Sequence, residues 1–139
     1  MIAMVGKVVE GDPYKEYEDI SNNLRHYGNL QFSQLTVFIL MNAAIINVVF
    51  GDNSSSSETT ENALKLIGLT LCILFIIMTN RITAHGSAYS KRAVELEKRL
   101  GYKQYTNRPS SRILSNRNAV LGVYLLAIVL WISSIILNL

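Results

Sequence analysis

The residues that most often do chemistry are few in this chain, and their spacing matches no catalytic or metal-binding motif. Cys72 is the only cysteine, and His26 and His85 are the only histidines. A single cysteine cannot form an intramolecular disulfide, and the sequence contains no HExxH, GxSxG or GxxxxGK pattern. We therefore predict no catalytic residue, no metal site, no cofactor and no enzymatic activity, and we interpret Cys72 as a small packing residue.

Lipid hydrolysis and proton-coupled transport are not favoured either. An acid pair that acts on lipids must converge, but Glu95 and Glu97 are two residues apart on a predicted helix and point in different directions. Proton-coupled transporters carry ionisable residues at membrane depth, whereas the apolar segments of this chain contain only Lys65, near one end of a segment. We expect Lys65 to extend outward to the membrane surface.

The elements that must position any functional residue are three long apolar segments. Half of the 139 residues are hydrophobic and only 17% are charged. The apolar residues cluster at 30–50, 63–79 and 118–139, and the first cluster would form a helix of about 31 Å, close to the thickness of a bilayer core. The sequence predicts an all-α membrane protein with three transmembrane helices, an amphipathic N-terminal helix and a cytoplasmic extension of the second span.

The distribution of lysine and arginine predicts the orientation. Three of these residues precede the first span, none lies in the serine-rich loop at 51–62, and nine lie between the second and third spans, at 80–117. Because positively charged segments resist translocation, we expect the N-terminus and residues 80–117 in the cytoplasm, and the 51–62 loop and the C-terminus outside.

Two segments beside the spans have amphipathic helical patterns. Residues 1–29 combine a tail with a helix that Asp12 can cap and that Pro13 can begin. The second span is expected to continue as a helix until Gly101, a typical stop residue. The apolar stripes of the two helices are Tyr17, Ile20, Leu24 and Tyr27, and Tyr89, Ala93, Leu96 and Leu100.

The spans carry amides that need hydrogen-bond partners. On a helix, Gln31 and Asn42 fall within about 20° of each other, and Gln34 lies nearby in the same span. Buried amides in lipid bond across helices, either within one three-helix unit or between subunits, where they could also line a pore. The candidate residues for a pore or an oligomer interface are Gln31, Gln34, Asn42, Tyr89, Ala93, Leu96 and Leu100.

The region between the second and third spans is strongly basic. Residues 81–117 hold nine bases and two acids, a net charge of +7, whereas residues 7–25 hold five acids and three bases, a net charge of −2. Anionic lipid headgroups, the acidic N-terminal helix or a cytoplasmic protein partner would each be attracted to this charge. The candidate contact residues are Lys91, Arg92, Lys98 and Arg99; no nucleic-acid-binding module is recognisable, so nucleic acid is not an expected partner.

Three stretches carry a resemblance to a known family: YEDISNNLRHYGNLQFSQLT, KRAVELEKRLGYKQYTNRP and ILSNRNAVLGVYLL. Over roughly residues 14–131 the chain resembles the RipA family of octameric bacterial inner-membrane proteins. The resemblance implies a homo-octamer in the bacterial cytoplasmic membrane whose cytoplasmic parts build a ring. A looser similarity links the chain to small pore-forming membrane proteins of anti-phage defence, including an accessory protein of RNA-targeting CRISPR systems.

Two functions are therefore expected from different classes. The first is a ring-forming, homo-oligomeric inner-membrane protein that could act as a pore in stress or defence. The alternative is a non-conducting scaffold or regulator that recruits a cytoplasmic or envelope-maintenance partner through residues 80–117.

Overall fold

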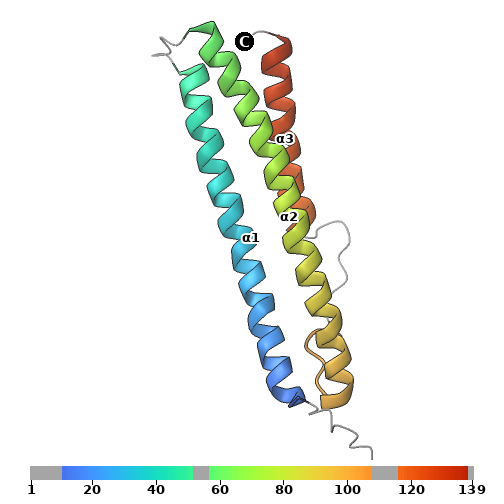
Figure 1. The fold of residues 1–139 in the computed structure, drawn as a ribbon. Coiled ribbons are helices and arrows are strands. Elements are labelled where there is room, and N and C mark those ends of the chain that lie inside the picture. The colour runs from blue at the N-terminus through green and yellow to red at the C-terminus, as the bar shows by residue number, and fades with distance from the viewer. Residues whose placement is uncertain (1–10, 52–56, 108–115, 138–139) are drawn as a thin grey trace, which may run out of the picture.

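The computed structural model describes residues 11–51, 57–107 and 116–137, and these residues form helices and no strands (Figure 1). The helices are α1 (Pro13–Phe50), α2 (Glu58–Leu100) and α3 (Asn116–Ile136). Most of the expected N-terminal tail, the centre of the serine-rich loop and the return at 108–115 lie outside the described residues.

Helix α1 joins two expected elements, the N-terminal helix and the first span, into one helix of 38 residues, about 57 Å long. Asp12 caps its start, because its carboxylate accepts a hydrogen bond of 3.0 Å from the backbone N–H of Tyr14. Pro13 occupies the first helical position, where no backbone donor is needed. The helix passes Gly28 without a break and ends at Gly51, whose N–H donates to the carbonyl of Asn47.

Helix α2 has 43 residues and is about 64 Å long, roughly twice the thickness of a bilayer core. It begins at Glu58, five residues before the expected start of the second span, because Ser57 caps it and two acids lie in its first turn. Its C-terminus is at Leu100, where Gly101 adopts the left-handed conformation with φ 78°.

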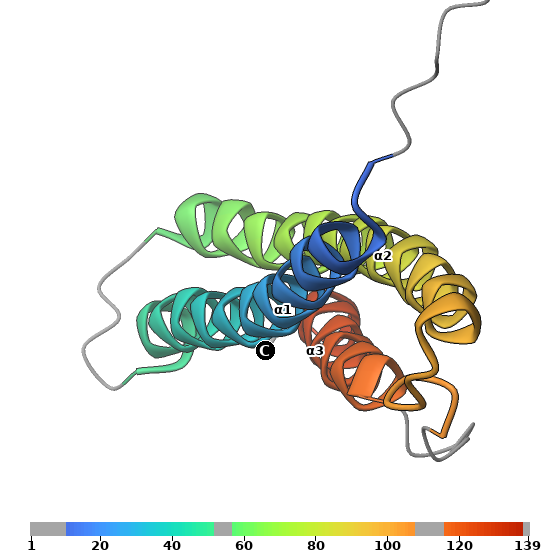
Figure 2. The ribbon, with the colours of Figure 1, turned by 90° about the horizontal axis from the view of Figure 1, so that it is seen from below.

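The three helices form an elongated bundle of two parts. Helices α1 and α2 are antiparallel along their length, and α3 lies beside only part of them (Figures 1 and 2). Near the start of α3, Arg117 donates to the side-chain oxygen of Asn80 at 2.9 Å. We call residues 13–29 of α1 and 81–107 the stalk, and the rest of the three helices the span region.

All three helices are long and apolar enough to cross a membrane, as expected of a multi-pass membrane protein. The span region is apolar outside as well as inside, because many of its large hydrophobic side chains are exposed. Phe32, Leu40, Leu66, Ile77 and Leu126 are examples, each at least half exposed. A surface of this kind is stable against lipid and unstable in water.

The interior of the span region is built around side chains from all three helices. Phe38 of α1, Phe75 of α2 and Tyr124 of α3 form one aromatic group, and the ring centroids of Phe38 and Tyr124 are 4.5 Å apart. Cys72 is fully buried in the same cluster. The apolar core therefore fixes α3 against the α1–α2 pair.

Candidate functional site on the helical stalk

The end of the stalk is organised by one buried carboxylate, Glu97, which is 1% exposed. Its Oε1 accepts hydrogen bonds from the Tyr17 hydroxyl at 3.0 Å and from the Tyr105 backbone N–H at 2.7 Å. Its Oε2 accepts from the backbone N–H of Thr106 at 2.8 Å and from the Thr106 hydroxyl at 2.7 Å. Glu97 thus ties the segment after α2 back onto both helices.

The electrostatics of this site follow from those four donors. Burial acts to raise the pKa of Glu97, but the Thr106 hydroxyl, the two backbone N–H groups and the Tyr17 hydroxyl outweigh it and lower the pKa to about 2. Burial, together with the hydrogen bond to Glu97, raises the pKa of Tyr17 to about 12. Glu97 is therefore ionised and Tyr17 protonated at neutral pH, so this pair is a structural clasp and not an acid–base couple.

The apolar stripes predicted for the two stalk helices pack against each other beneath this clasp. Ala93 and Leu96 are buried with Ile20 and Tyr105, while Tyr89 packs against this cluster. Leu100 is half-buried at the end of α2. Four of the candidate interface residues, Tyr89, Ala93, Leu96 and Leu100, thus lie in or beside the stalk's own interior.

Aromatic rings extend this packing along the stalk. Tyr17 contacts Tyr102 and Tyr105, with ring centroids 5.4 and 6.0 Å apart. Further towards the span region, Tyr27 stacks on His85 at 6.0 Å with an interplanar angle of 7°. His85 is therefore a packing residue here, and no group of three or more metal-binding side chains occurs among the described residues.

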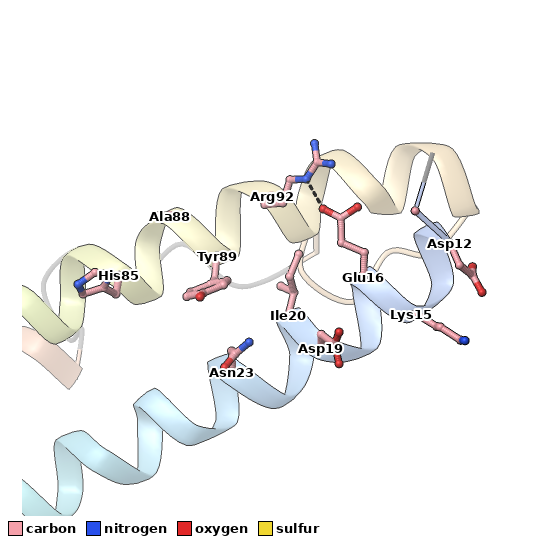
Figure 3. A pocket seen from close by; sticks show the side chains of 11 residues that line it. Asp12, Lys15, Glu16, Asp19, Ile20, Asn23, His85, Ala88, Tyr89 and Arg92 are labelled. Carbon is pink, nitrogen blue, oxygen red and sulfur yellow. Dashed lines mark hydrogen bonds and ion pairs between the residues drawn. The ribbon is translucent and has the colours of Figure 1, made fainter. Parts of the chain in front are cut away.

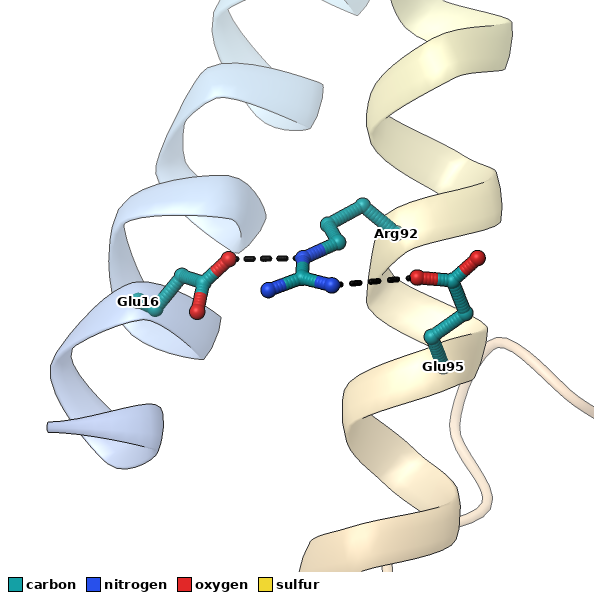
Figure 4. A network of polar contacts seen from close by, with 3 residues as sticks. All are labelled: Glu16, Arg92 and Glu95. Carbon is teal, nitrogen blue, oxygen red and sulfur yellow. Dashed lines mark hydrogen bonds and ion pairs between the residues drawn. The ribbon is translucent and has the colours of Figure 1, made fainter. Parts of the chain in front are cut away.

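An exposed ion-pair network lies on the stalk surface, where Arg92 sits between two glutamates (Figure 4). The guanidinium Nε is 2.7 Å from Glu16 Oε1 on α1, and Nη1 is 3.1 Å from Glu95 Oε2 on α2. The hydrogen bond to Arg92 lowers the pKa of Glu16, and the hydrogen bonds to Glu16 and Glu95 raise the pKa of Arg92. Arg92, expected to contact a lipid or a partner, therefore joins α1 to α2.

Beside this network an open groove of ≈ 700 Å³ is lined by both stalk helices (Figure 3). Asp12, Lys15, Glu16 and Asp19 line it from α1 and the residue before it, and His85 and Arg92 line it from α2. The groove carries both signs of charge. The other three candidate contact residues, Lys91, Lys98 and Arg99, are exposed on α2.

The amides of the span region bond between helices of one chain. Gln34 is 6% exposed, and its Nε2 donates to the Phe75 carbonyl at 3.0 Å and to Thr79 Oγ1 at 3.2 Å. The Thr79 hydroxyl in turn donates to the Tyr124 hydroxyl at 3.2 Å. This relay links α1, α2 and α3.

A second link lies closer to the 51–57 connection. Asn42 Nδ2 donates to the Phe38 carbonyl at 3.0 Å, and Asn42 Oδ1 accepts from the Trp131 indole N–H at 2.9 Å. Trp131 is fully buried against Gly68. Gln31, the third predicted amide, is half-buried, and its Nε2 has no hydrogen-bond partner among the described residues.

The prediction that the Lys65 side chain extends outward to the membrane surface is wrong. It is 2% exposed, within the bundle, one turn of α2 from Gly68. The sequence suggested an outward side chain because Lys65 lies near the end of the expected span. The earlier start of α2, however, places almost two further helical turns beyond it.

The sequence did not reveal Glu97, Thr79, Tyr124 or Trp131 as structural residues. A charged residue two positions from the exposed Glu95 gives no local signal of burial, and the partners of Glu97 lie 8, 9 and 80 residues away. The available clue was the polar YKQYT segment directly after the Gly101 stop, which supplies three of the four donors.

In comparisons with protein-family models, characterised proteins and solved structures, none matches this chain.

Proposed function

We propose that this chain is a homo-oligomeric membrane protein of the bacterial inner membrane, in which neighbouring stalks assemble into a cytoplasmic ring. The observation that carries the proposal is the separation of charge between the two helices of one firmly packed stalk. Residues 12–25 hold four acids and two bases, a net charge of −2, and residues 81–100 hold five bases and two acids, a net charge of +3.

Only part of this charge is neutralised within one chain. Arg92 forms ion pairs with Glu16 and Glu95. Glu18 and Asp19 on α1 and Lys98 and Arg99 on α2 are exposed. An acidic patch on one stalk that meets a basic patch on the next is a head-to-tail contact, and repeated head-to-tail contacts form a ring when the rotation between neighbours closes. The resemblance to the RipA family supports the same assembly and suggests eight copies.

The span amides give little support to a polar pore. Gln34 and Asn42 are buried and hydrogen-bonded within one chain, so they are not free to line a water-filled axis. We therefore propose that the ring is primarily an assembly platform. Conductance of the purified protein in planar bilayers tests this choice. Step-like currents would favour a pore, whereas bilayers without current would favour the platform.

The assembly itself is tested by charge reversal and native mass spectrometry in a mild detergent. Glu18→Lys with Asp19→Lys, or Lys98→Glu with Arg99→Glu, should each reduce the oligomer, and the four changes together should restore it. Glu58→Lys, an acidic reversal at the far end of α2, is the matched control and should leave the oligomer intact. A wild-type protein that is monomeric under all conditions would refute the proposal.

A second candidate function is recruitment of a cytoplasmic protein by the basic face of α2. It is favoured by the exposure of Lys91, Lys98 and Arg99, which contact solvent while Arg92 is held by Glu16. If recruitment and not assembly is the role of these residues, reversal of the three charges would release a co-purifying partner without dissociating the oligomer. Loss of the oligomer without loss of any partner would favour assembly as the role of these residues.

A further inference from the structure

A second open groove lies in the span region, at its junction with the stalk, and is unlike the charged groove of the stalk. It is ≈ 480 Å³ in volume and is lined by α1 and α2. Leu30 and Val37 of α1 and Phe75 and Met78 of α2 form apolar walls. Arg81 is the charged member of the described lining, and it lies at the stalk end of the groove.

The groove lies at the depth where a bilayer changes from hydrocarbon to headgroups. Leu30 and Met78 belong to the segments expected to span the membrane, whereas Arg81 lies two residues beyond the expected end of the second span. Leu30, Val37 and Met78 are 40–49% exposed, so these walls face the acyl chains of lipid. Arg81 is exposed as well, and an arginine at the end of a span extends to the depth of lipid phosphates.

This groove and the charged groove of the stalk lie on the same face of the α1–α2 pair. On α1, Val37 and Leu30 line the first groove, and Asn23 lines the second at the same seven-residue spacing. On α2, Met78 and His85 are related in the same way. Seven residues are close to two helical turns, so residues at this spacing share a face. An occupant of the apolar groove therefore has hydrocarbon at one end and a polar surface at the other, which requires an amphiphile.

The length of the groove favours a lipid over a helix of a second copy. Its apolar wall on α1 extends from Leu30 to Val37, about 10 Å at the helical rise. A transmembrane helix packed beside α1 and α2 would need contact along about 30 Å of bilayer core, whereas an acyl chain needs contact only near its headgroup. The charge favours an anionic headgroup, because Arg81 is basic and no acid is among the described lining residues.

We propose that this groove binds one anionic phospholipid from the leaflet on the stalk side. The lipid phosphate contacts the guanidinium of Arg81, and one acyl chain lies against Leu30, Val37 and Met78. The headgroup points along the shared face towards the stalk. The inference depends on the three apolar helices crossing a membrane and is independent of the proposed ring.

Native mass spectrometry of the full-length protein in a mild detergent can test the contact with Arg81. The probes are anionic phosphatidylglycerol and zwitterionic phosphatidylcholine with the same acyl chains, and phosphatidylglycerol should bind more tightly. Arg81→Gln should weaken its binding about fivefold, as expected for loss of one charge near the membrane surface. Lys91→Gln, which removes an exposed base of α2 outside the groove, should leave it unchanged. Equal binding of the two lipids, or equal effects of the two variants, would refute the contact.

Variants on α1 separate this groove from the general lipid-facing surface. Val37→Trp should fill the groove and weaken the binding of phosphatidylglycerol about tenfold. Val48→Trp should not, because Val48 is about equally exposed on α1 but lies outside the groove. Equal effects of the two tryptophans would refute the site.

The same spectra report the number of copies in each particle. If Val37→Trp dissociates an oligomer and leaves lipid binding unchanged, a second copy occupies the groove and the lipid assignment is wrong. If the wild-type protein is monomeric but shows the expected lipid binding, the proposed ring fails and this site is supported.

Discussion

Glu97 is the residue whose chemistry most directly determines the state of the stalk end. Its pKa is about 2 in the folded chain, against an ordinary value of 4.5, so its stabilising contribution is fully present above pH 4.5. This contribution is lost as the pH falls from 4.5 towards 2, because the protonated carboxyl is a weaker acceptor. We expect the near-ultraviolet circular dichroism of the clustered tyrosines to change over this range.

The matched variants for this prediction are Glu97→Gln and Glu95→Gln. Glu97→Gln should lower the free energy of unfolding by about 1–3 kcal/mol, because an amide replaces a carboxylate that accepts four hydrogen bonds, and should remove the acid transition. Glu95→Gln should leave the transition unchanged, because the Glu95 carboxylate is exposed and bonds to the exposed Arg92. An identical acid transition in both variants would show that another group controls it.

Gly68 is the second residue with a measurable structural role. A Cβ atom added there would lie 2.7 Å from Cζ2 and from Nε1 of Trp131, which is closer than van der Waals contact allows. Gly68→Ala should therefore separate α2 from α3 and lower the free energy of unfolding by about 1–3 kcal/mol. Gly122→Ala is the control, since a Cβ there meets nothing within 4 Å and alanine favours the helix. Thermal unfolding in detergent compares the two, and equal stability would contradict the close approach.

For single residues, local periodicity in the sequence predicts which side chains are buried on one helix face. It does not predict a hydrogen-bond partner that lies far away in the sequence. The predicted stripe of Tyr89, Ala93 and Leu96 lies in the stalk interior because helical spacing places it on one face. The partners of Gln34 and Asn42 could not be predicted, because residues 41 and 89 positions away supply them. The choice between packing within one chain and contact between chains depends on those partners.

At the scale of the elements, the Asn42–Trp131 hydrogen bond joins α1 to α3. Asn42→Ala and Trp131→Phe should each destabilise the bundle, and the double variant should be less destabilised than the sum of the two. The expected coupling is about 0.6 kcal/mol and at most about 1.7 kcal/mol, the range found for hydrogen bonds between membrane helices. Unfolding of all four proteins in mixed detergent measures it, and strictly additive effects would argue against the bond.

The ends of the helices were predicted with unequal success. Asp12, Pro13 and Gly101 are strong local signals, and α1 and α2 begin or end beside them. Residues 58–62 were expected to lie in a loop because they are polar, yet Ser57 and the acids of the first turn make them a helical start. Polarity predicts exposure to solvent and does not by itself predict a loop.

At the scale of the whole molecule, three spans put the two ends of the bundle on opposite sides of a membrane. Because Cys72 is the only cysteine and is buried, its replacement by alanine gives a background for single-cysteine labelling. Ser57→Cys should react with a membrane-impermeant maleimide in intact cells, and Lys98→Cys should react only after permeabilisation. The reverse pattern would show the opposite orientation.

The continuity of α2 has a mechanical consequence. A helix of 43 residues without a break, packed against α1, joins the lipid-facing part of the chain directly to the charged end of the stalk. A tilt of the packed α1–α2 pair, imposed by a change in membrane thickness or tension, would therefore displace Lys91, Lys98 and Arg99 at the far end of the stalk. The thickness or tension of the lipid would in this way change the position of a charged surface that lies about 30 Å along α2 from the apolar segment.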